Sequence, residues 1–180
     1  MQDVEMIQDQ ETADGAMAPD NENETAQVSA DEWTAAALAH ASILLTLILG
    51  VAGGIGALIG PAVALAMYFG YREKSRFVAF HALQSFAYQV VGVLFYAVFA
   101  AVLAVWVTIA WTVSGLLAAV LIGLLMMPFA LLMTLLMGLL LVCAPFVWLS
   151  YGLYASYQVY QGRNFYYRFI GDWVEREVKI

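Results

Sequence analysis

Long uninterrupted runs of apolar residues dominate the sequence and predict helices that cross a membrane. No Asp, Glu, Lys or Arg occurs in residues 33–71 or in residues 77–162. A bilayer core of ~30 Å needs about 20 apolar residues in each spanning helix. The first run is long enough for two short helices, and the second is too long for two ordinary ones. The pattern therefore predicts an all-α, polytopic helical membrane protein.

We expect the first run to fold as a helical hairpin, over about 33–50 and 55–71. Its middle, GVAGGIGALIGP, contains the residues that most often form turns. Small residues also let helices approach closely inside a membrane. The candidates for such close packing are Gly50, Gly54, Gly56 and Gly60, and their spacing of four is weak evidence for a dimer. One long tilted helix is the alternative to the hairpin.

Positive charges decide how often the second run crosses the membrane. They concentrate at the cytoplasmic ends of spans. In this chain they flank the second run, as Arg72, Lys74 and Arg76 before it and Arg163, Arg168, Arg176 and Lys179 after it. Both groups are expected in the cytoplasm, so an even number of crossings separates them. We place spans at about 80–110 and 132–160, which gives about four helices in two hairpins. Residues 112–131 become a loop-side extension, a kinked helical continuation or a re-entrant piece.

Acidic residues are concentrated before the first apolar run. Residues 1–32 hold ten of the fourteen acidic residues and no Lys or Arg. They include few large apolar side chains, so burial cannot offset the entropy of ordering them. We predict a disordered acidic tail over 1–32, a transmembrane domain over 33–162 and a basic, amphipathic cytoplasmic tail over 163–180. The opening segment lacks the positive start of a signal peptide.

A polar stripe interrupts the apolar pattern where the second run begins. At about 100° per residue, one helix face collects His81, Gln84, Ser85, Tyr88 and Gln89. Polar side chains at membrane depth turn toward the bundle interior, because an unsatisfied polar group in hydrocarbon is costly. His40 lies seven residues after Trp33, and His81 lies five residues after Arg76. We therefore expect the two imidazoles at similar depths on facing helices.

Three roles are open for this polar face. The histidines can form an interhelical hydrogen bond that fixes packing, a proton relay or gate, or a ligand pair for haem or a metal. Two histidines without carboxylates are a poor ligand set, so we predict no cofactor and no metal site. The membrane part contains no catalytic triad, phosphate-binding loop or close carboxylate pair, and we predict that the protein is not an enzyme. A basic face of the kind that nucleic acid requires is also missing.

Four segments carry a resemblance to a known family. They are WTAAALAHAS at 33–42, GGIGALIGPAVALAM at 53–67, RFVAFHALQSFAYQ at 76–89 and YQVYQGRNFYYRFIGD at 158–172. Together they resemble a bacterial and archaeal family of small membrane proteins of unknown function, related to the Tic-twenty component of plastid protein import. The resemblance implies four helices and, in the plastid relatives, a part in a protein-conducting complex.

These observations lead to two expectations for function. The first is a structural or assembly subunit of a membrane complex, in the plasma membrane with both termini in the cytoplasm, which could assist protein translocation or insertion. Its partners would be the lipid bilayer and other membrane subunits or further copies of itself. The alternative is a small channel or transporter that uses the polar face around His81.

Overall fold

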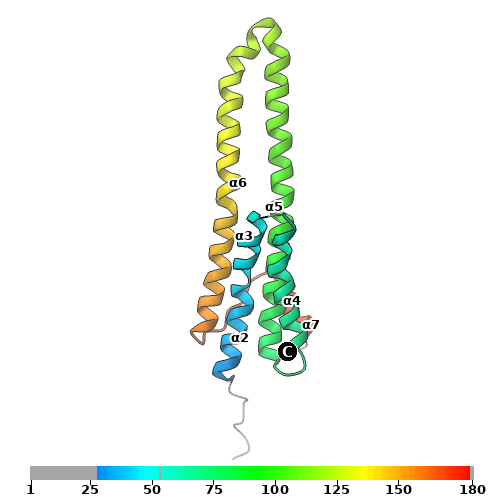
Figure 1. Ribbon diagram of the computed structural model, residues 1–180, viewed down its shortest axis with the longest axis vertical. Helices are drawn as coiled ribbons and strands as arrows, with labels where there is room; N and C mark the ends of the chain where they lie inside the picture. Colours follow the sequence, from blue (N-terminus) through cyan, green and yellow to red (C-terminus); the bar gives the residue numbers. More distant parts are fainter. Residues whose placement is uncertain (1–27, 53, 179–180) are drawn as a thin grey trace, which may run out of the picture.

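The structure is a computed structural model that describes residues 28–52 and 54–178. It is an all-helical bundle with four segments long and apolar enough to cross a membrane, as the apolar runs predicted (Figure 1). The elements are α2 (Ala30–Ala41), α3 (Ile43–Ala52), the 3-10 turn η1 (Gly54–Leu58), α4 (Ile59–Tyr71), α5 (Arg76–Leu117), the 3-10 turn η2 (Ala118–Val120), α6 (Ile122–Tyr160) and α7 (Gly171–Val178). The first apolar run forms a hairpin rather than one long helix.

Serine caps set where two of these helices begin. The Ser29 side chain accepts a hydrogen bond from the backbone N–H of Glu32 at 3.2 Å, and the Glu32 carboxylate accepts one from the Ser29 N–H at 2.8 Å. This capping box starts α2 within the stretch that we expected to be a disordered tail. The rest of that tail, residues 1–27, lies outside the described residues. Ser75 caps α5 in the same way, by accepting from the Val78 N–H at 3.2 Å.

The two hairpins differ greatly in length. The 42 residues of α5 extend about 63 Å at ~1.5 Å per residue, roughly twice the ~30 Å of a bilayer core. In Figure 1, α3 and η1 end well below the turn that joins α5 to α6. The far half of the long hairpin therefore has no neighbour from the short hairpin. Its apolar side chains, such as Leu116 and Leu125, are exposed in the isolated chain.

Residues 112–131 are a helical continuation that ends in a tight turn. Helix α5 runs on to Leu117, η2 turns the chain, and α6 starts at Ile122. The predicted spans at 80–110 and 132–160 were therefore too short. No charge or proline stops α5 in this region, so the helix continues until the chain reverses at Leu121, which has a left-handed φ of 67°.

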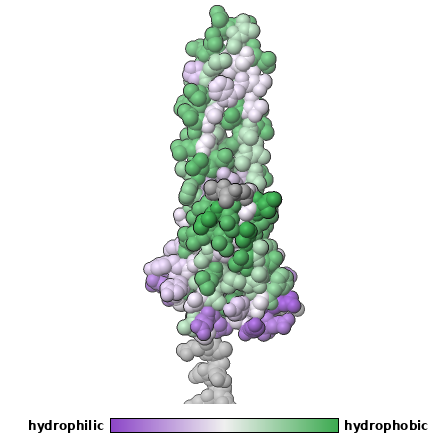
Figure 2. Space-filling view, in the orientation of Figure 1, coloured by the Kyte–Doolittle hydropathy of each residue, from purple (hydrophilic) through white to green (hydrophobic). Residues whose placement is uncertain are grey.

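The polar parts of the chain gather at one end of the bundle. Figure 1 places the start of α2, the loop between α4 and α5, and α7 at that end, and Figure 2 shows hydrophilic residues concentrated there. Arg72, Lys74 and Arg76 lie in and beside this loop, while Arg163 and Arg168 follow α6. The two basic groups thus share one end, as an even number of crossings requires.

The segment after α6 is part of the bundle rather than a separate tail. Val174 of α7 is fully buried and packs with Phe80 and Leu83 of α5. Tyr167, which precedes α7, is only 3% exposed. The predicted boundary at residue 163 therefore does not divide the packed structure.

The left-handed turn at Leu121 yields a stability prediction. A left-handed conformation costs a non-glycine residue about 1–2 kcal/mol, and glycine avoids this cost but loses more chain entropy. Leu121 is exposed, so Leu121→Gly removes little packing. We expect the variant to gain roughly 0.5–1 kcal/mol, measured by thermal unfolding in detergent.

Leu125→Gly is the matched control, because Leu125 is equally exposed but lies inside α6. It should lose about 1 kcal/mol, as glycine does within a helix. Equal losses in both variants would show that the chain does not turn at Leu121 in this way.

Candidate functional site

A buried group of polar side chains, here called the polar cluster, joins the helices in the lower half of the bundle. Each of its members is at most 5% exposed: His40, Ser42, Thr46, His81, Gln84, Ser85, Gln89 and Tyr167. Four of them belong to the helix face identified from the sequence, and His40 is the residue expected opposite that face. Tyr88, the fifth residue of the face, lies partly buried beside them. The cluster brings together α2, α3, α5 and the segment before α7.

The two histidines meet at the base of the cluster. His40 Nε2 of α2 lies 3.2 Å from His81 Nδ1 of α5, so one ring donates a hydrogen bond to the other. This is the pairing on facing helices expected from their distances to Trp33 and Arg76. The Phe77 ring meets His81 edge-on at 4.6 Å between centroids. The pair is thus enclosed by aromatic side chains.

Gln89 makes three side-chain hydrogen bonds within the cluster. Its amide nitrogen donates to Ser42 Oγ at 2.9 Å and to Ser85 Oγ at 3.0 Å. Its amide oxygen accepts from Thr46 Oγ1 at 2.9 Å. One side chain of α5 therefore binds α3 and the residue that separates α2 from α3.

The break between α2 and α3 is closed by serine hydroxyls. Ser42 donates to the Ala39 carbonyl at 2.8 Å, and Ser85 donates to the same carbonyl at 2.7 Å. Ser42 also lies 3.2 Å from the Gly60 carbonyl of α4. Backbone groups at the break are thereby satisfied inside the protein, as hydrocarbon requires.

Tyr167 reaches the cluster from outside the four long helices. Its backbone N–H donates to Gln84 Oε1 at 2.9 Å, and its ring stacks on Tyr88 with centroids 4.3 Å apart. The hydroxyl lies 3.5 Å from His40 Nδ1. Burial raises the pKa of the Tyr167 hydroxyl above its usual range, so the group stays neutral. The C-terminal segment thus closes the cluster on the polar side.

The four glycines predicted to pack closely have different surroundings. A Cβ on Gly60 would lie 1.9 Å from Thr46 Oγ1, and one on Gly56 would lie 2.1 Å from the Leu49 carbonyl oxygen. A Cβ on Gly50 would contact Ala57 at 3.1 Å, whereas one on Gly54 would meet nothing within 4 Å. Three of the four therefore bring the short hairpin together within one chain. The fourth borders open space.

Pro145 frees a carbonyl inside α6, and α5 supplies its partner. A proline has no N–H to donate to the carbonyl four residues earlier, which here belongs to Leu141. The Tyr96 hydroxyl of α5 donates to that carbonyl at 3.2 Å. Three residues beyond Pro145, the Trp148 carbonyl accepts from the Tyr88 hydroxyl at 2.8 Å. These bonds connect the two long helices.

The cluster is suited to joining helices. In the described part of the chain, its members carry hydroxyl, amide and imidazole groups, and only His81 Nε2 and Gln84 Nε2 lack a partner among its buried polar atoms. No three His, Cys, Asp or Glu side chains of residues 28–52 and 54–178 come together in a group that could hold a metal ion. Among the described basic residues, the side chains of Arg72 and Arg163 bond outside the cluster, to Glu73 and Gln158.

Sequence reasoning missed three members of the cluster. Ser42 and Thr46 carried a usable signal, because they are polar residues inside the first apolar run and lie four residues apart, on one helix face. Tyr167 carried none, since it lies in an irregular segment without periodicity. Only the folded chain brings it to Gln84 and Tyr88.

These features define a multi-pass helical membrane protein whose helices are joined by a buried polar cluster. A sequence model of the magnetosome magnetite crystal formation protein family, MamF/MmsF, matches residues 31–174. The match covers most of the chain, and the chain belongs to this family. No curated protein and no solved structure matches it.

The resemblance to relatives of Tic-twenty was wrong. The family match spans the four segments on which it rested, but it assigns them to the magnetosome family. Those segments consist largely of small, aromatic and isolated polar residues. Such residues are common in many membrane proteins, because small residues let helices pack closely and aromatic residues prefer the membrane–water interface. They therefore discriminate poorly between families. Without this resemblance, the expected link to protein translocation has no support.

The bond between Tyr96 and the Leu141 carbonyl can be tested by a double-mutant cycle. Tyr96→Phe should lower the stability of the protein in detergent by about 0.6–1.7 kcal/mol, the range for hydrogen bonds between membrane helices. In a Pro145→Ala background the new backbone N–H at this position can bond the Leu141 carbonyl instead. The cost of Tyr96→Phe should then shrink toward zero. Equal costs in both backgrounds would show that the carbonyl freed by proline is not the partner that matters.

Proposed function

We propose that this chain acts in magnetite crystal formation as a structural or assembly subunit of the magnetosome membrane. Membership of the family points to the process and to the membrane, and the polar cluster points to the manner of action. The observation that carries the proposal is that the polar side chains of the bundle bond to one another and to backbone carbonyls of neighbouring helices. A rigid, non-enzymatic scaffold fits this arrangement best.

The rest of the long hairpin offers no polar path that would favour a channel. The hydroxyls of Thr108, Ser114 and Thr134 each donate to the carbonyl four residues earlier in their own helix, at 2.8 Å. Trp111 donates to Thr134 Oγ1 at 2.8 Å. These four polar groups are therefore already engaged, and a water-filled route past them would have to break these bonds.

The proposal includes an orientation and a set of partners. The polar end, with its two groups of Lys and Arg, faces the cytoplasm, because basic residues are retained on that side. Both termini then lie in the cytoplasm. The exposed apolar surface contacts lipid and other membrane proteins of the same complex.

Gln89→Leu tests whether the cluster holds the bundle together. The change removes three hydrogen bonds, so we expect a loss of about 2 kcal/mol at ~0.6 kcal/mol per bond, measured by unfolding in detergent. In host cells that lack the native chain, wild-type protein should restore magnetite crystals and Gln89→Leu should restore them poorly, as seen by electron microscopy.

Ser150→Ala is the matched control. Ser150 is exposed and its hydroxyl bonds only the Phe146 carbonyl of its own helix, so neither stability nor crystals should change. Crystals that are normal without the chain would refute its part in their formation. A proton or cation leak in reconstituted vesicles at pH 5–8, abolished by His81→Leu in a folded protein, would favour the channel instead.

The orientation can be tested with reporters fused after Ile180. A reporter that works only in the cytoplasm should be active there, and one that works only after export should be silent. The opposite pair of results would place the C-terminus outside the cytoplasm and would overturn the orientation with both termini inside.

A further inference from the structure

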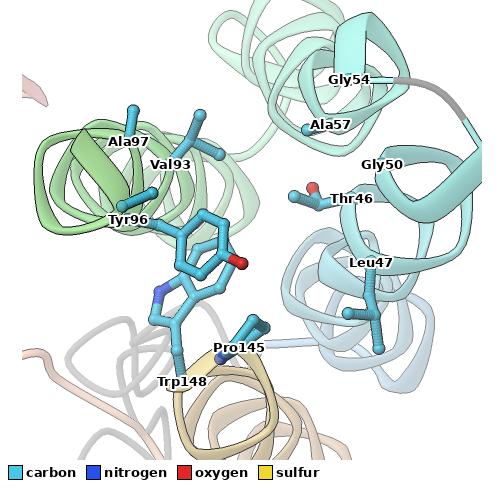
Figure 3. Close-up of a pocket in the computed structure, with 11 residues that line it drawn as sticks. Thr46, Leu47, Gly50, Gly54, Ala57, Val93, Tyr96, Ala97, Pro145 and Trp148 are labelled. Atoms are coloured by element: carbon cyan, nitrogen blue, oxygen red, sulfur yellow. The ribbon is translucent and has the colours of Figure 1, made fainter. Parts of the chain in front are cut away.

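A cavity lies where the tip of the short hairpin meets the long one. Its volume is about 490 Å³, and it is partly open to the outside of the bundle. Figure 3 shows its walls: Thr46, Leu47 and Gly50 of α3, Gly54 and Ala57 of η1, Val93, Tyr96 and Ala97 of α5, and Pro145 and Trp148 of α6. Four elements thus surround a single hollow.

The cavity exists because small residues face one another across it. Gly50, Gly54 and Ala57 of the short hairpin stand opposite Ala97 of α5. Protein interiors are normally packed as densely as organic crystals, with few voids larger than a water molecule. Gly50 and Gly54 carry no side chains that could fill the space. The hollow is partly open, so a molecule from outside the chain can enter it.

Two of the three polar side chains at the wall, Thr46 and Tyr96, are already bonded within the protein. Thr46 Oγ1 donates to Gln89, and the Tyr96 hydroxyl donates to the Leu141 carbonyl. The third, the Trp148 indole, has no partner for its Nε1, but this nitrogen is buried against Gly92, where an added Cβ would lie 2.3 Å from it, so it offers the hollow no accessible donor. No charged side chain lines the hollow. The cavity therefore suits a molecule that makes no hydrogen bonds.

We propose that this cavity binds one acyl chain of a membrane phospholipid. The volume lies within the ~300–1,000 Å³ typical of ligand pockets, and apolar cavities of this kind do not hold water. The wall belongs to the charge-free part of the chain, so the opening faces hydrocarbon, where acyl chains are the abundant apolar molecules. A helix from another chain, about 10–12 Å across, is too thick to enter. The headgroup stays outside.

Gly54→Leu is designed to fill the cavity without disturbing the fold. A Cβ at Gly54 meets nothing within 4 Å, and its φ lies outside the left-handed region, so the backbone accepts a side chain. Protein in lipid nanodiscs would be photolabelled with a phosphatidylcholine that carries a diazirine within one acyl chain, and the labelled peptides mapped by mass spectrometry. Wild-type labelling should concentrate on Val93, Ala97 and Ala100, and Gly54→Leu should reduce it several-fold.

Gly138→Leu is the matched control, because Gly138 also borders open space but lies on the exposed surface of α6 away from the cavity. It should leave the labelling at Ala97 unchanged. Native mass spectrometry should also show a phospholipid retained by wild type and Gly138→Leu and lost from Gly54→Leu. Uniform labelling that ignores Gly54→Leu would overturn the proposal, and so would retention of an isoprenoid quinone in place of a phospholipid.

Discussion

Hydrocarbon offers no hydrogen-bond partner, and this constraint determines how the lower half of the bundle is built. A break in regular helix structure exposes backbone carbonyls, and side chains of α5 reach two of them. Ser85 of α5 bonds the Ala39 carbonyl at the break in the first helix. Tyr96 bonds the Leu141 carbonyl that Pro145 leaves free. The same bonds that remove unsatisfied groups also fix the neighbours of α5.

The constraint acts on only part of the molecule. The short hairpin, the polar cluster and the segment before α7 surround the first turns of α5, where nearly every side chain is buried. Farther along, α5 and α6 face each other alone, and most of their apolar side chains are exposed. The lower half is thus a defined bundle, while the far half depends on lipid or on other proteins for its surroundings. The cavity lies at the border between the two.

A scaffold role agrees with this division. Assembly in a membrane requires a fold that does not change and a surface that other molecules can contact. The lower half of the bundle provides the fold, and the far half of the long hairpin provides the surface. The sequence similarity supports a part in magnetite crystal formation at the level of the family. In the proposed role, the described residues contribute through the packing of helices.

The sequence by itself determined the helical fold, the hairpin in the first apolar run and the inward face from His81 to Gln89, because these follow from helix period and from the cost of polar groups in hydrocarbon. It also indicated that His40 and His81 lie at one depth. Only the tertiary structure decided the length of α5 and α6, since a charge-free run carries no mark of where a helix ends. It alone brought Tyr167 to Gln84. Contacts made by an irregular segment depend on where the chain returns in space, and no local pattern records that position.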